Sequence, residues 1–127
     1  MVGRTKGILE KDANSAAAVA AFTIAAFGND DNTFVNPASG SVPFAGIFQF
    51  ATTGAGKPVR IALDGISPLT ISANVTRGQW ITSDANGCGI PAAPAPGTNM
   101  SVIGKAMNSA APGQTCFVLI NAIQIQG

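Results

Sequence analysis

Short stretches of apolar residues, each bounded by glycine, proline, asparagine or aspartate, run through most of this chain. Two stretches carry the same pattern, since residues 44–66 and residues 102–123 each read as a strand, a glycine-containing turn and a second strand. Gly46 aligns with Gly104 in the first strands of the two patterns. Two strands joined by a short glycine-containing turn are typical of a β-hairpin. The sequence therefore predicts two related hairpins.

The second strands of these hairpins align after a gap of one residue. Residues 59–64, Val-Arg-Ile-Ala-Leu-Asp, then match residues 116–121, Cys-Phe-Val-Leu-Ile-Asn. In this alignment Ala62 corresponds to Leu119. The repeat is therefore one of strand pattern rather than of residue identity.

Further short strands are predicted outside the hairpins. Residues 33–35, 69–73 and 79–82 are apolar stretches bounded by turn residues, and residues 122–126 extend the final strand. The tight turn at residues 84–87 contains Asn-Gly, which favours positive φ. About nine short strands, with turns at regular spacing and no convincing long helix, predict an all-β protein: a single small barrel or sandwich built from two related hairpin units.

Residues 14–28 fit two structures. A capping residue at the start and a glycine at the end suit an alanine-rich helix. Alternatively, residues 20–27 form a strand with Phe22 and Ile24 on one face. We favour the strand, because Leu-Thr-Ile at residues 69–71 precedes the second hairpin as Phe-Thr-Ile precedes the first.

The first 13 residues have a different character from the rest. They are polar, lack apolar periodicity and contain Gly3 and Gly7. Such a terminal segment predicts an extended N-terminal arm, residues 1–13, in front of a β-domain of residues 14–127.

Composition points to a subunit of an assembly. Only 10% of the 127 residues are charged, against about 25% in average soluble domains, so the surface is rich in Ala, Gly, Ser, Thr and Asn. The net charge of +1 gives no electrostatic case for binding nucleic acid or a membrane. No apolar run approaches the ~20 residues of a membrane span. We also reject a signal peptide at residues 16–27, because acidic residues precede this stretch.

Few residues suggest chemistry. The chain has no histidine or tyrosine, which removes much of the acid–base repertoire. The six carboxylates lie in the arm or in turns, where aspartate is a common structural residue. Residues 54–57, Gly-Ala-Gly-Lys, lack the full spacing of a phosphate-binding loop. We therefore predict no enzyme activity, no cofactor and no metal site.

The two cysteines, Cys88 and Cys116, leave two possibilities open. Two cysteines do not make a disulfide framework, and buried thiols that act as small apolar groups are the favoured reading. A disulfide within the chain or between subunits is the alternative. Metal binding is disfavoured because the chain has no Cys-x-x-Cys.

Several short motifs carry a family resemblance. Residues 56–65 read Gly-Lys-Pro-Val-Arg-Ile-Ala-Leu-Asp-Gly, and residues 75–87 read Val-Thr-Arg-Gly-Gln-Trp-Ile-Thr-Ser-Asp-Ala-Asn-Gly. Val-Ile-Gly-Lys-Ala follows at 102–106 and Gly-Gln-Thr-Cys-Phe-Val-Leu-Ile at 113–120. Over about residues 44–123, the chain resembles the small capsid decoration, or cement, proteins of tailed bacteriophages. It departs from their pattern at Lys57 and Gln114, where glutamate is frequent, and at Gln79, where aspartate is common.

The resemblance implies a structural role on a virus particle. It implies a non-enzymatic protein, made in the host cytoplasm, that binds the exterior of a phage capsid and clamps neighbouring subunits of the major capsid protein, usually as a homotrimer. Its partners would be the major capsid protein and copies of itself. Within the arm, the residues expected to contact the capsid are Val2, Arg4, Lys6, Ile8 and Leu9.

Two alternative functions stay open on the sequence. The chain could be another virion structural protein, such as a fibre base or a surface β-domain, or a small carbohydrate-binding β-module. A fibre base would be present in few copies per particle, whereas a decoration protein would approach the copy number of the major capsid protein.

Overall fold

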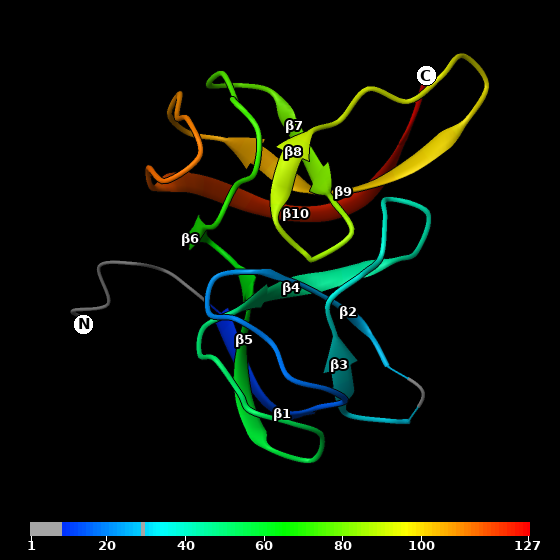
Figure 1. Cartoon of the computed structure of the whole chain (residues 1–127). Helices are drawn as coiled ribbons and strands as arrows, with labels where there is room; N and C mark the ends of the chain where they lie inside the picture. The colour runs from blue at the N-terminus through cyan, green and yellow to red at the C-terminus, as the bar shows by residue number, and fades with distance from the viewer. Residues whose placement is uncertain (1–8, 29) are drawn as a thin grey trace.

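The computed structural model describes residues 9–28 and 30–127, and this part of the chain contains ten β-strands and no helix, so it has no membrane-spanning helix (Figure 1). The strands are β1 (Leu9–Ser15), β2 (Ile24–Phe27), β3 (Thr33–Val35), β4 (Phe44–Phe48), β5 (Pro58–Asp64), β6 (Ile66–Leu69), β7 (Trp80–Ser83), β8 (Gly89–Pro91), β9 (Asn99–Ala106) and β10 (Cys116–Gln126). The all-β prediction is confirmed, with one strand more than expected.

The strands form two bodies of five. The first five close into a barrel in the order β1-β3-β2-β4-β5, with β1 and β3 parallel and all other neighbours antiparallel. The last five form a sheet in the order β6-β10-β9-β7-β8. Figure 1 shows the barrel in the lower half of the view and the second sheet above it. The predicted single barrel or sandwich is thus a barrel joined to a second sheet.

Both predicted hairpins are present, with the same register. In the first, β4 and β5 are antiparallel and Ile47 lies opposite Ala62. In the second, β9 and β10 are antiparallel and Lys105 lies opposite Leu119. In the sequence alignment, Ile47 matches Lys105 and Ala62 matches Leu119. The two hairpins therefore pair equivalent residues. The aligned patterns are therefore equivalent structures.

The equivalence extends to all ten strands. Strands β1–β5 form unit 1 (residues 9–64), and strands β6–β10 form the matching unit 2 (residues 66–126). Every neighbouring strand pair of unit 1 has a counterpart in unit 2 with the same register. The matching pairs are Ala13–Val59 and Leu69–Cys116, Ala25–Gly46 and Ile81–Gly104, Phe27–Phe34 and Ser83–Gly89, and the parallel pairs Ser15–Phe34 and Ile71–Gly89. The last pair is an isolated bridge, so unit 2 repeats the closure of the barrel at a single point.

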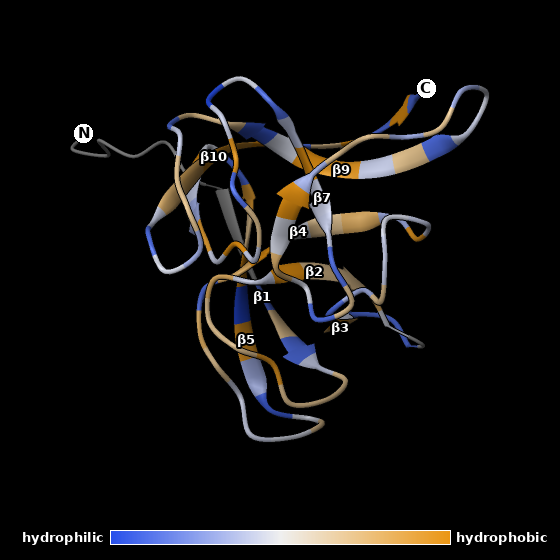
Figure 2. Ribbon diagram, turned by 45° about the horizontal axis from the view of Figure 1, so that its top comes forward, coloured by the Kyte–Doolittle hydropathy of each residue, from blue (hydrophilic) through white to orange (hydrophobic). Residues whose placement is uncertain are grey.

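Two apolar cores reflect this duplication. Residues of unit 1 alone fill the barrel core, among them Phe34, Phe48 and Ile61. The second core combines the inner face of unit 2 with four buried residues of unit 1: Ile24, Phe44, Ile47 and Ala62. Side chains alternate along a strand, so β2, β4 and β5 each contribute residues to the barrel core from one face and to the second core from the other. Figure 2 shows hydrophobic stretches on β2, β4 and β9. Full burial of a large aliphatic side chain contributes about 1.5–3 kcal/mol, so this shared core joins the units firmly.

The boundary of the predicted arm differs from the structure. Residues 9–13 belong to β1, where Asp12 lies opposite Arg60 and Ala13 opposite Val59. This pairing gives partners to the backbone groups of β5, which would otherwise be a barrel edge. Leu-Glu-Lys-Asp-Ala-Asn-Ser has little strand propensity, which explains why the sequence did not indicate a strand. Residues 1–8 lie outside the described residues.

The strand expected at residues 20–27 is confirmed only for Ile24–Phe27. Phe22 precedes it with a φ of 57° and is partly exposed, so it does not share a face with the buried Ile24. Its backbone N–H donates to Phe48, just as the N–H of Gly78, with a φ of 88°, donates to Ala106. Phe22 is therefore the counterpart of Gly78.

The strand expected at residues 69–73 is also shifted. Strand β6 runs from Ile66 to Leu69, and Ile71 takes part only in an isolated bridge. Leu69 matches Ala13 in the duplication, so the predicted match of residues 69–71 with residues 22–24 is wrong. Pro68 lies within β6, which pairs only with β10 and is an edge strand, where proline is tolerated.

Candidate interaction surfaces

Three carboxylates, those of Asp12, Asp64 and Asp84, support local structure. Asp12 forms an ion pair with Arg60, with 3.0 Å between Oδ1 and Nε, and Asp64 accepts a hydrogen bond from the backbone of Gly65. Asp84 accepts hydrogen bonds from Ser72 Oγ and from the backbone N–H groups of Asn86 and Cys88. No group of three or more histidine, cysteine or acidic residues gathers among residues 9–28 and 30–127. The structural reading of these aspartates therefore holds.

Asp84 holds the turn between β7 and β8. Partial burial acts to raise its pKa, but the hydrogen bonds from Ser72 and from the backbone of Asn86 and Cys88 outweigh burial and lower the pKa below its ordinary value. The carboxylate is thus ionised and engaged with its own turn. It is a structural anion rather than an acid or base for a substrate.

Both cysteines are free thiols in the structure. Cys88 is half-buried, and burial followed by the negative charge of Asp84 raises its pKa. Cys116 is buried in the second core, and burial raises the pKa of its thiol. Thiols with raised pKa values are weak nucleophiles at neutral pH. A disulfide between subunits stays a prediction.

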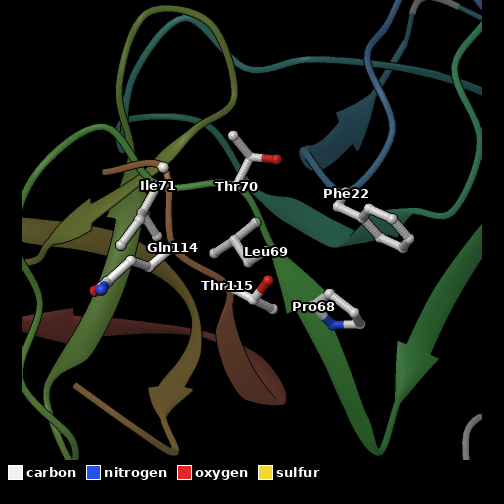
Figure 3. A pocket seen from close by; sticks show the side chains of 8 residues that line it. Phe22, Pro68, Leu69, Thr70, Ile71, Gln114 and Thr115 are labelled. Atoms are coloured by element: carbon white, nitrogen blue, oxygen red, sulfur yellow. The ribbon is translucent and has the colours of Figure 1, made fainter. Parts of the chain in front are cut away.

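A small open hollow of about 210 Å³ lies where the two units meet (Figure 3). Figure 3 shows Phe22 beside Pro68 and Leu69 at this hollow, and the backbone N–H of Thr70 donates to the carbonyl of Phe22. Its other lining residues are Ile71, Gly113, Gln114 and Thr115. None of the lining side chains is charged or titratable, so the hollow offers no catalytic groups.

An apolar surface lies on the outer side of the second sheet. We name it the β10 face and define it by five residues: Ile66, Pro68, Met107, Phe117 and Leu119. Ile66 lies opposite Leu119, Pro68 lies opposite Phe117, and the N–H of Met107 donates to Phe117. Apart from the half-buried Pro68, each has a relative exposure of 41–47%. The β10 face is therefore a contiguous apolar group across β6, β10 and the end of β9.

One basic residue borders the β10 face. Lys105 lies opposite Leu119, and its Nζ is 4.8 Å from the centroid of the Trp80 ring. This cation–π contact draws the ammonium group over the sheet. The border thus combines an aromatic ring with a single positive charge.

Three residues of the β10 face, Pro68, Met107 and Phe117, correspond to polar residues of unit 1. Pro68 and Phe117 match Asp12 and Arg60, which form the ion pair described above, and Met107 matches Gln49, since the N–H of Gln49 donates to Arg60. The fold therefore does not require apolar residues at these positions. Their apolar character in unit 2 is a property of the surface and not of the architecture.

The sequence contains a pattern that indicates the β10 face. Residues 116–120, Cys-Phe-Val-Leu-Ile, are apolar at every position, a pattern typical of a strand that is covered on both faces. Within the chain, only Cys116, Val118 and Ile120 are buried, while Phe117 and Leu119 are exposed. Within residues 9–28 and 30–127, no segment covers the second face of β10.

The residues predicted to contact a partner lie almost entirely outside the described part of the chain. Val2, Arg4, Lys6 and Ile8 fall among residues 1–8. Leu9 opens β1, opposite Asp64. Their role in binding stays a prediction.

Comparison with known proteins identifies relatives. Residues 4–122 match the family described as phage cement protein. Among solved structures, the chain is similar to the head fibre gp8.5 N base of bacteriophage phi29, with 16% identity and a TM-score of 0.61, over 94% of this chain and 99% of that one. At this identity the likeness shows a shared fold alone. No curated protein sequence matches the chain.

Proposed function

Because the chain belongs to the phage cement protein family, we propose that it binds the outer surface of a phage capsid and stabilises the shell by clamping neighbouring major capsid subunits. The family match over residues 4–122 carries this proposal. Cement proteins are structural, non-enzymatic virion proteins. The described residues agree with this class, since the carboxylates of Asp64 and Asp84 hold turns and both thiols are buried or half-buried.

The shape of the body supports a clamp. Two units share one core through Ile24, Ile47 and Ala62, so a load applied to one unit is transmitted to the other through packed side chains. With only 10% charged residues, contacts would rest on backbone groups and small or apolar side chains. Such contacts suit a permanent place in a shell better than exchange with free partners.

For the capsid contact we propose the N-terminal residues. Val2, Arg4, Lys6, Ile8 and Leu9 combine apolar and basic side chains, and the first four occupy every second position of the sequence. An extended segment of this kind can add to the edge of a sheet through its backbone and place alternate side chains in pockets. The segment leads directly into β1, so binding of the segment to the capsid would transmit force to the barrel through this strand.

Self-association completes the proposal. A homotrimer on the capsid exterior would contact several major capsid subunits at once, and the linked contacts would raise the overall affinity. The protein would be made in the host cytoplasm and would join the particle there.

Rebinding to capsids that lack the protein tests the proposal. The purified chain is expected to bind such capsids and to raise the temperature at which they disassemble. Removal of residues 1–8, which leaves β1 intact, is expected to weaken binding, as is the double variant Arg4→Gln, Lys6→Gln. Lys57→Gln, at an exposed turn position, is the matched control and should bind like the wild type. Absence of binding by the full chain would overturn the proposal, and unchanged binding after the deletion would remove the N-terminal residues from it.

A second candidate function is a fibre base, favoured by the fold shared with the phi29 head fibre base. The two functions predict different copy numbers. Quantitative mass spectrometry of intact particles would find a cement protein at a level comparable to the major capsid protein. A fibre base would be present in only a few copies.

A further inference from the structure

The duplication shows what covers the outer face of unit 1. Three residues of that face, Ile24, Ile47 and Ala62, are buried in the second core, against the inner residues of unit 2. They lie in adjacent strands, with Ile47 opposite both Ile24 and Ala62. Within one molecule, this face is therefore the contact surface for another copy of the same five-strand fold.

In the part of the chain that the structure describes, the matching face of unit 2 has no such cover. Lys105 corresponds to Ile47 and lies opposite both Trp80 and Leu119, the counterparts of Ile24 and Ala62. Leu119 and Lys105 are exposed, and Ile66 and Phe117 extend this face as part of the β10 face. The positions of Ile47 and Ala62, buried in unit 1, are thus open in unit 2 at Lys105 and Leu119. Pro68 and Phe117 correspond instead to Asp12 and Arg60, which unit 1 also leaves exposed.

An exposed, contiguous apolar group of this kind is a candidate interaction site, because extended uncovered apolar patches on soluble proteins are often sites of association. None of the five residues of the β10 face is acidic, and Lys105, which lies opposite Leu119, is drawn over Trp80. It therefore has no charge pattern that would select a highly charged partner. Burial of its aliphatic and aromatic side chains is the main source of affinity that it offers.

We propose that the β10 face is the surface through which one copy of this chain binds another, an inference that rests on the self-association included in the proposed function. The interface continues the one inside the molecule, because β10 buries Val118 and Ile120 against unit 1 on one side and presents Phe117 and Leu119 on the other. In the assembly, residues 116–120 of β10 are covered on both faces, as their continuous apolar sequence predicts.

The duplication supplies the test variant. Pro68→Asp, Met107→Gln and Phe117→Arg together place on unit 2 the residues that unit 1 carries at the same positions, Asp12, Gln49 and Arg60. These residues are compatible with the fold, since unit 1 contains them as an ion pair and its neighbour. Phe50→Asn is the matched control: it changes an exposed phenylalanine outside the β10 face to the residue at the equivalent position of unit 2, Asn108.

Sedimentation equilibrium over a range of concentrations is the measurement. The full-length wild type and Phe50→Asn are expected to give the mass of an oligomer, and the triple variant the mass of a monomer with an unchanged circular dichroism spectrum. Phe117→Arg alone, with the same expected loss, serves if the triple variant does not fold. A wild type that is monomeric at every concentration, or a folded variant that keeps the oligomer mass, overturns the inference. Capsid rebinding is measured separately, so that an oligomer which does not bind capsids refutes the proposed function and leaves this inference standing.

Discussion

Gly46 and Gly104 occupy equivalent positions in the two units, and each lies against one carbonyl oxygen of the neighbouring strand. A Cβ atom at Gly46 would overlap the carbonyl oxygen of Ala62, and one at Gly104 would overlap that of Leu119. The sequence alignment of the two hairpins pairs Gly46 with Gly104 and Ala62 with Leu119. The repeated glycine is therefore explained by one repeated contact, a backbone approach that leaves no room for a side chain.

Replacement of either glycine by alanine tests this contact. Gly46→Ala and Gly104→Ala are each expected to lower the free energy of unfolding by about 2–3 kcal/mol, because the added methyl group meets backbone rather than a movable side chain. Urea unfolding followed by tryptophan fluorescence measures the change. Gly54→Ala is the control, since a Cβ there has no neighbour within 4 Å and a surface change of this kind costs less than ~0.5 kcal/mol. Equal stability of all three variants would refute the explanation.

Local pattern was sufficient to predict the hairpins but not the whole duplication. Glycine-bounded apolar strands indicated β4–β5 and β9–β10, whose partners are near in sequence. The sequence did not indicate that β1 matches β6. Leu-Glu-Lys-Asp-Ala-Asn-Ser and Ile-Ser-Pro-Leu form equivalent strand pairings but have no common pattern of apolar and polar residues. Phe22 was misplaced for a related reason, since a phenylalanine at positive φ is rare and only the position of Gly78 explains it.

The candidate surfaces were predicted less well than the fold. An apolar run such as residues 116–120 does not reveal which face the chain itself covers, and that depends on how unit 1 packs on unit 2. Two of the turn aspartates were interpreted correctly, because Asp64 and Asp84 act within their own turns through hydrogen bonds to nearby backbone groups. The predicted N-terminal contact residues concern a partner that the chain alone does not contain.

Stability is expected to fall in acid partly through Asp84. Its pKa in the folded state lies below the ordinary value of 3.8, so its contribution is present above the unfolded pKa and is lost as the pH falls through the folded pKa. Asp84→Asn should therefore reduce stability near neutral pH and flatten the dependence below about pH 4. Thermal unfolding from pH 2 to pH 7 measures this, with the exposed turn variant Asp31→Asn as control. An Asp84→Asn profile parallel to the wild type would contradict the assignment.

The two thiols are expected to differ in reactivity. Burial raises both pKa values, but Cys116 has no exposed surface whereas Cys88 is only half-buried. In the native protein a maleimide should modify Cys88 slowly, faster at higher pH, and Cys116 only after unfolding. Intact-mass spectrometry over time follows both reactions. Rapid native modification of Cys116 would contradict the buried position, and a dimer band on non-reducing electrophoresis would instead support a disulfide between subunits.

Ile47 and Lys105 provide a comparison of the joined and open faces within one chain. They are equivalent residues, but Ile47 is fully buried between the units and Lys105 is exposed beside Trp80. Ile47→Ala is expected to cost about 2–4 kcal/mol of unfolding free energy, through lost burial and a cavity in the shared core. Lys105→Ala should cost less than about 1 kcal/mol, the value of an exposed cation–π contact. Chemical unfolding of the monomeric triple variant is the appropriate background, because self-association would otherwise add to the measured stability. Similar costs at the two positions would show that the units do not depend on their shared core.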